Sequence, residues 1–179
     1  MSDATQVVLV GLSGSGKSTV GKILAQLLGW RFVDLDQLIE AKTTLTVAEI
    51  FAQHGEDRFR QWEADLTKRL ASQHQVVIAP GAGWITNPAL PKLLPPGAVA
   101  VWLRVTPEQA WARIRATGVK RPLLEVPEAL ERLQSLLAER RALYEQAHAA
   151  FDTDDLDPRV VAELIYQWLI KQKKSALSS

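Results

Sequence analysis

Residues 11–18 read Gly11-Leu12-Ser13-Gly14-Ser15-Gly16-Lys17-Ser18 and match the pattern G-x-x-x-x-G-K-[ST] at every fixed position. The glycines of this pattern let successive backbone N–H groups face one point, where a following helix N-terminus adds partial positive charge. Lys17 can reach the outer phosphates of a nucleotide, and the Ser18 hydroxyl can hold Mg²⁺. The segment therefore predicts a phosphate-binding loop.

The residues on either side of this loop have the patterns that it requires. Residues 6–10 form a short apolar run that is typical of a buried strand. Residues 19–28 carry apolar side chains at helical spacing, at Val20, Ile23, Leu24, Leu27 and Leu28. A strand, a glycine loop and a helix in this order are the structural context of a phosphate-binding loop.

The rest of the chain continues this alternation of strands and helices. Further strands are predicted at residues 31–34, 75–79, 98–105 and 150–152, with helical segments between them. Such alternation predicts a parallel sheet with helices on both faces. We therefore expect the α/β class, as a three-layer α-β-α fold around a central parallel five-stranded sheet.

Capping residues mark where several helices begin. Residues 46–49, Thr-Val-Ala-Glu, form a capping box that opens a helix through about residue 54, and residues 56–72 predict another helix. Thr106 followed by proline is a strong helix start. A long helix is expected over residues 127–149, and the last one begins at Pro158.

Residues 117–127 break this regularity, because they hold a glycine and two prolines between two helices. One interpretation is a plain connector. The other is a lid of about residues 116–126 that carries Arg121 over a bound nucleotide. The pattern alone leaves both open.

Composition narrows the class of protein. The 179 residues predict one domain, placed at residues 1–174, with a disordered tail at 175–179. The apolar fraction of 47% is ordinary for a globular protein, and no apolar run approaches the ~20 residues of a membrane span. A net charge of +1 does not indicate a nucleic-acid partner, and the lack of cysteine excludes disulfides and thiolate chemistry. We expect a cytoplasmic monomer with no membrane or nucleic-acid partner.

Two aspartates, Asp34 and Asp36, stand where the second predicted strand ends. The carboxyl ends of strands flank the ligand crevice of an open parallel sheet. Carboxylates at i and i+2 in that place could serve a metal ion and an acceptor hydroxyl. The alternative is that one of them only caps the next helix.

Two arginines and a glycine turn are further candidates. Arg60 lies early in a helix, where cations are disfavoured, so it needs an anionic partner such as Glu56, Glu63 or a ligand carboxylate. Arg140 lies in a charged run that is typical of a solvated face. The turn Gly81-Ala82-Gly83 follows the third strand and allows close approach of the backbone to a ligand, although a plain turn explains it equally.

Taken together, these segments resemble the shikimate kinase family, in the nucleoside-monophosphate-kinase-like group of P-loop enzymes. The resemblance covers nearly the whole chain. It rests on five motifs in order: the phosphate loop, the two aspartates within residues 32–40, the segment 50–63 with Phe59-Arg60 and Glu63, Arg121-Pro122-Leu123-Leu124, and Arg140 four residues before Tyr144.

The resemblance implies ATP-dependent phosphorylation of shikimate at its 3-hydroxyl, with Mg²⁺ as the cofactor. Lys17 would contact the transferring phosphate, and Arg121 would neutralise charge on the phosphates. Ser18 and Asp34 would serve the metal, and Asp36 would bind the substrate hydroxyls and orient the attacking one. The implied ATP-binding residues are Gly14, Ser15, Gly16, Lys17, Ser18, Thr19, Arg121 and Arg115, the last stacking on adenine. The implied substrate-binding residues are Asp36, Arg60, Gly81, Ala82, Gly83 and Arg140.

The chain departs from the family at one clear place, because the turn after the third strand usually has three consecutive glycines and here the second is Ala82. A positive φ at Ala82 would strain the backbone, and its methyl group or the adjacent Trp84 could narrow the substrate site. A related small-molecule kinase, such as a gluconate-type kinase, is therefore one alternative. A nucleotide-binding regulatory module that no longer transfers phosphate is another.

Overall fold

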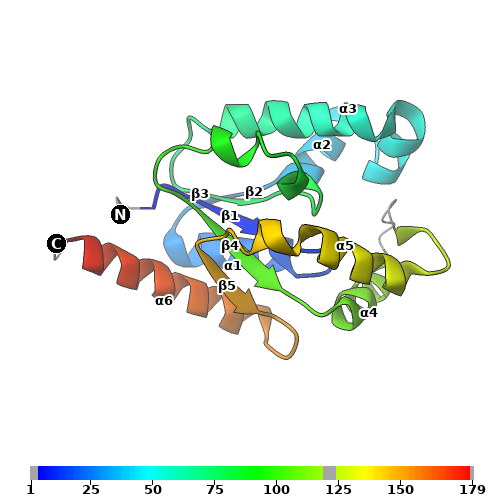
Figure 1. The fold of residues 1–179 in the computed structure, drawn as a ribbon. Helices are drawn as coiled ribbons and strands as arrows, with labels where there is room; N and C mark the ends of the chain where they lie inside the picture. The colour runs from blue at the N-terminus through cyan, green and yellow to red at the C-terminus, as the bar shows by residue number, and fades with distance from the viewer. Residues whose placement is uncertain (1–3, 119–123, 178–179) are drawn as a thin grey trace.

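Five parallel strands form the centre of the molecule, in the order β2-β3-β1-β4-β5 (Figure 1). The computed structural model describes residues 4–118 and 124–177. This sheet confirms the expected α/β class, and each strand lies within one residue of its predicted range. The strands are β1 Gln6–Val10, β2 Arg31–Asp34, β3 Val76–Ala79, β4 Ala98–Arg104 and β5 Ala149–Asp152.

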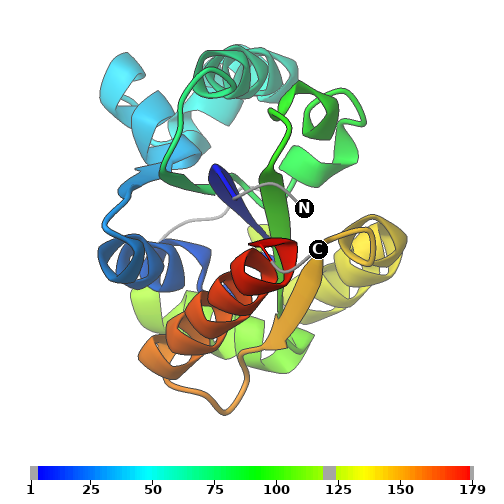
Figure 2. The ribbon, with the colours of Figure 1, turned by 90° about the vertical axis from the view of Figure 1, so that its left-hand side faces the viewer.

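Helices cover both faces of the sheet and complete the expected three layers (Figure 2). On one face α1 packs beside α6, and the other face is covered by α3, α4 and α5. The helices are α1 Lys17–Leu28, α2 Leu35–Thr43, α3 Val47–Leu70, α4 Pro107–Thr117, α5 Ala129–Tyr144 and α6 Pro158–Leu177, with short 3₁₀ turns η1 Trp84–Thr86 and η2 Pro91–Leu93.

The alternation of side chains along β1 explains how this strand serves both layers. Val7 and Leu9 are packed in the cluster that holds α1 and α6, whereas Val8 and Val10 belong to the cluster on the opposite face. All five residues of β1 are buried. A central parallel strand is covered on both faces, so it reads as a continuous apolar run.

The predicted helix starts are confirmed. Thr46 forms the capping box with Glu49, and the Thr106 side chain accepts a hydrogen bond from the backbone of Gln109. Gly55 interrupts α3 with a φ of 78° and a ψ of 164°, which separates the two helices that the sequence predicts there. The break at Gly55 lies a few residues before Arg60, so Arg60 belongs to the second helical segment of α3.

One predicted helix end was wrong. The long helix α5 ends at Tyr144 rather than near residue 149, because residues 149–152 form the edge strand β5 beside β4. The last helix, α6, begins at Pro158 as predicted and continues to Leu177. In the described part of the chain, no helix has the length and apolar character needed to cross a membrane.

Removal of a buried side chain from α1 tests the packing of the α1–α6 layer. Leu24 is fully buried, so Leu24→Ala should lower the free energy of unfolding by about 2–5 kcal/mol through lost burial and a residual cavity. Leu27 lies on the same helix and is 37% exposed, so Leu27→Ala should lower it by less than about 1 kcal/mol. Urea unfolding of both variants measures the difference, and equal losses would contradict this packing.

Candidate active site

The phosphate loop lies between β1 and α1 in the conformation that its glycines permit. Gly14 and Gly16 have φ values of 80° and 89°, and a Cβ on Gly14 would lie 2.5 Å from the carbonyl oxygen of Ala110. Lys17 Nζ donates to the carbonyl oxygens of Gly11 and Leu12 at 2.9 and 2.8 Å. The lysine is thus folded against its own loop, at the place where phosphate oxygens would take over those contacts.

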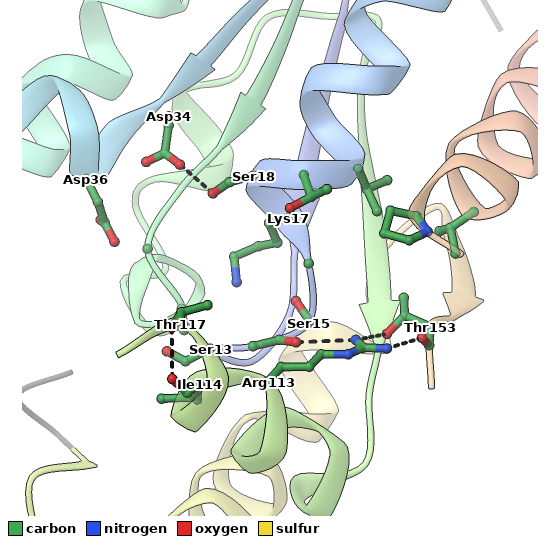
Figure 3. Close-up of a pocket in the computed structure, with 18 of the residues that line it drawn as sticks. Ser13, Ser15, Lys17, Ser18, Asp34, Asp36, Arg113, Ile114, Thr117 and Thr153 are labelled. Atoms are coloured by element: carbon green, nitrogen blue, oxygen red, sulfur yellow. Dashed lines mark hydrogen bonds between the residues drawn. The ribbon is translucent and has the colours of Figure 1, made fainter. Parts of the chain in front are cut away.

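A cavity of about 520 Å³ opens over this loop (Figure 3). Side chains from several elements surround it, including Lys17, Ser18, Asp34 and Asp36, which the sequence predicts to act together. Those residues come from β1–α1 and β2–α2, whose strands end at the same edge of the sheet. The further lining residues include Ser13, Gly14, Ser15, Gly16, Thr19, Gly81, Ala82, Arg113 and Pro158.

Asp34 caps the next helix, as one interpretation of the sequence predicts, and its other oxygen contacts Ser18, the second candidate metal ligand. Its Oδ1 accepts a hydrogen bond from the backbone N–H of Gln37 at 3.1 Å and caps α2. Its Oδ2 accepts from the Ser18 hydroxyl at 2.5 Å. The cap holds the carboxylate in place, so the pair presents two hard oxygen donors at the wall of the cavity, a donor set that suits Mg²⁺.

A second cavity, of about 60 Å³, adjoins the first. The two share Ser13, Asp36, Gly81 and Ala82 in their linings. Arg60 and Arg140 line only the second, together with apolar side chains that include Phe51, Phe59 and Leu124. The chain thus places a small cavity with two guanidinium groups directly beside the phosphate-binding cavity, with Asp36 at their junction.

Arg60 is held by two carboxylates of its own helix. Its Nη2 lies 2.8 Å from Glu56 Oε1, and its Nη1 lies 2.9 Å from Glu63 Oε2. Both protein partners that the sequence suggested are therefore present. A Cβ on Gly83 would meet this guanidinium, so a larger residue there would displace the Arg60 side chain, whereas the φ of Gly83 is not positive.

Arg140 does not lie on a solvated face, which corrects that reading of the charged run. It is 7% exposed, and its Nη1 donates to the carbonyl oxygen of Ala82 at 3.0 Å. The Tyr144 hydroxyl donates to the same oxygen at 3.3 Å. Two donors from α5 therefore hold the turn after β3 against the second cavity.

Glu63 is an acidic group in an unusual environment. Its side chain is fully buried, and burial raises its pKa to about 7 although Arg60 acts in the opposite direction. The nearby negative charge of Asp36 also raises the pKa. A Cβ on Gly81 would lie 2.8 Å from Asp36 Oδ1 and 3.1 Å from Glu63 Oε1, so the two carboxylates approach the same glycine.

Arg113, which the sequence analysis did not select, lies at the larger cavity, and the predicted Arg115 does not. Arg113 lines the larger cavity and donates to Thr153 Oγ1 at 3.1 Å and to the Asp154 carbonyl at 3.1 Å, whereas Arg115 is exposed and lines neither cavity. The signal was the helical phase of α4, whose buried face holds Ala110 and Ile114. Arg113 borders that face and Arg115 points away from it.

The sequence was then compared with known proteins. Residues 13–170 match the family model for shikimate kinase. A shikimate kinase of Symbiobacterium thermophilum is 44% identical over 162 residues, which cover 89% of this chain and 93% of that protein. The chain belongs to the shikimate kinase family.

Solved structures show the same relationship. The shikimate kinase from Acinetobacter baumannii in complex with shikimate has a TM-score of 0.88 and 36% sequence identity, and the match covers 94% of each chain. A gluconokinase from Sinorhizobium meliloti matches with a TM-score of 0.64 at 21% identity, over 98% of this chain and 97% of that one. The second likeness shows the shared fold alone.

The departure from the shikimate kinase pattern at Ala82 does not strain the backbone. In the described part of the chain, Thr44 and Gln75 are the non-glycine residues with positive φ, so Ala82 has an ordinary negative φ. Trp84 does not narrow the substrate site either, because it is buried in the core and lines neither cavity. Arg121 and the rest of residues 119–123, the middle of the predicted lid, lie outside the described residues.

The raised pKa of Glu63 predicts a pH effect on stability. Between about pH 4.5 and 7, the unfolded chain ionises Glu63 while the folded protein keeps it protonated, so folding loses free energy as pH rises. Relative to Glu63→Gln, the wild type should lose on the order of 3 kcal/mol of unfolding free energy across this range. Urea unfolding of both proteins at pH 5, 6, 7 and 8 checks this, and parallel pH curves would contradict it.

Proposed function

We propose that this protein transfers the γ-phosphoryl group of ATP to the 3-hydroxyl of shikimate. The observation that carries the proposal is the pair of adjoining cavities, one over a phosphate loop and one with two buried or half-buried arginines, joined at Asp36. Membership of the shikimate kinase family supports the same reaction. A kinase for a small hydroxy acid needs these two binding sites side by side.

The larger cavity would take ATP. The loop residues Gly14 to Thr19 would bind the phosphates through their backbone N–H groups, and Lys17 would turn from the Gly11 and Leu12 carbonyls toward the transferring phosphate. Ser18 and Asp34 would hold Mg²⁺, which neutralises phosphate charge when bound. Arg113 lies on the side of the cavity away from Asp36 (Figure 3), and the adenine would lie there. Pro158 also lines this cavity.

The smaller cavity would take shikimate. Its carboxylate would lie between Arg60 and Arg140, because a planar guanidinium offers paired donors to a carboxylate. The Gly81–Gly83 turn would supply backbone contacts to the same substrate. Asp36 would then face the ring hydroxyls and orient the attacking one toward the phosphate, since it borders both cavities.

Closure of residues 116–126 would exclude water from the transfer, which otherwise competes with the acceptor hydroxyl. Leu124 is 6% exposed and lines the smaller cavity, so the end of this segment already covers the substrate side. Arg121 would act on the phosphates in the closed state. The protein would work as a cytoplasmic monomer, and its lack of cysteine fits a reducing compartment.

A coupled ADP-release assay tests the function. With Mg-ATP, ADP release should depend on shikimate and should stay at the no-acceptor level with gluconate, because the chain belongs to the shikimate kinase family. Asp36→Asn should lower turnover at least about 100-fold while ATP binding is retained, since it removes the base that orients the hydroxyl. Release with gluconate alone, or release that needs no acceptor, would contradict the proposal.

The nucleotide subsite has a test with a matched control on the same helix. Arg113→Ala should raise KM for ATP about tenfold, because it removes a cation from the wall of the larger cavity. Arg115→Ala should leave that KM unchanged, since Arg115 is exposed and lines neither cavity. Steady-state kinetics at saturating shikimate measure both, and the opposite ranking would restore Arg115 as the adenine contact.

A further inference from the structure

Trp84 follows the glycine turn directly and has no part in the reaction described above. It is 2% exposed, and its indole N–H donates to Thr67 Oγ1 at 3.0 Å. Thr67 is 3% exposed and donates its own hydroxyl proton to the carbonyl oxygen of Glu63 at 2.8 Å. A buried chain of two hydrogen bonds therefore joins the turn after β3 to α3.

The direction of this chain is fixed by its chemistry. An indole N–H can only donate, and a hydroxyl has one proton, so Thr67 must accept from Trp84 and donate to Glu63. Neither group has water as an alternative partner, because both are buried. Loss of the Thr67 hydroxyl would leave the indole N–H unpaired, which is costly in a dry interior.

Both ends of this chain of hydrogen bonds connect to residues that line the smaller cavity, Gly81 and Arg60. At one end, the backbone N–H of Trp84 donates to the Gly81 carbonyl at 3.0 Å and closes the Gly81–Trp84 turn. At the other end, the Glu63 side chain contacts Arg60 at 2.9 Å. Trp84 thus closes the turn through its backbone N–H, and its indole side chain links the turn to α3, the helix that carries Arg60.

We propose that Trp84 and Thr67 are positioning residues that set the distance between the glycine turn and Arg60, and thereby the affinity for the acceptor acid. The inference rests on the proposed function, because it concerns the shikimate half of that site. From the other side, Arg140 and Tyr144 hold Ala82, so the turn is fixed between α3 and α5. Neither Trp84 nor Thr67 lines the ATP cavity, so an effect confined to the acid distinguishes positioning from general destabilisation.

Thr67→Val tests this by replacing the hydroxyl with a methyl group of similar size. KM for shikimate should rise about three- to tenfold, while KM for ATP and kcat stay within about twofold. Thr67→Ser should restore the wild-type KM, because it keeps the hydroxyl. Trp84→Phe should also raise KM for shikimate, because it removes the indole N–H. It replaces Thr67→Val as the test if Thr67→Val yields no folded protein.

Thr43→Val is the matched control. Like Thr67, Thr43 donates its hydroxyl proton to a carbonyl oxygen four residues earlier in its helix, that of Ile39 at 2.8 Å. In the described part of the chain, Thr43 makes no hydrogen bond to the glycine turn. This variant should leave both KM values unchanged. If Thr67→Val lowers thermal stability yet leaves KM for shikimate at the wild-type value, or if Thr67→Ser does not restore it, the positioning role is refuted.

Hydrogen–deuterium exchange provides a readout that does not depend on turnover. Peptides covering residues 81–84 should exchange faster in Thr67→Val than in wild type or Thr43→Val, because the turn has lost one of its two anchors. Unchanged exchange refutes the link between the turn and α3. Absence of shikimate-dependent ADP release in the wild type would instead refute the proposed function, so the two failures are distinct.

Discussion

Three neighbouring parallel strands, β2, β3 and β1, end at one edge of the sheet, and every part of the site depends on that shared edge. The phosphate loop follows β1, the two aspartates follow β2 and the glycine turn follows β3. Parallel pairing puts these three loops side by side although they are far apart in the sequence. The two arginines of the smaller cavity then come from α3 and α5, which cover the same face of the sheet.

Charge is arranged differently in the two halves of the site. Lys17, Ser18 and Asp34 surround a cavity with room for a nucleotide, whereas Arg60 and Arg140 are held by protein partners at the wall of a small one. Asp36 borders both. Burial raises the pKa of Glu63 to about 7, so near that pH a large part of Glu63 is protonated, which leaves more of the positive charge of Arg60 for an acidic ligand.

Local signals in the sequence were enough for the fold and for most of the residues that the structure brings together at the two cavities. The phosphate loop, the strand ranges and the helix caps at Thr46 and Thr106 depend on neighbouring residues, so they could be predicted. The burial of Arg140 could not be predicted from its charged surroundings, because its partner is the Ala82 carbonyl, 58 residues away. Trp84 likewise required the fold, since its partner Thr67 lies on another element. The position of Arg113 could have been predicted from the sequence, because helical periodicity places it beside the buried residues of α4.

In the proposed function, one chain brings a nucleotide and a small hydroxy acid together at Asp36. Phosphorus and proton NMR of a reaction with Mg-ATP and shikimate tests it most directly, because the spectra identify both the product and the hydroxyl that carries the phosphate. We expect a phosphomonoester on the 3-hydroxyl, formed in equal amount with ADP. ADP accompanied only by inorganic phosphate, or a phosphate on another hydroxyl, would contradict it.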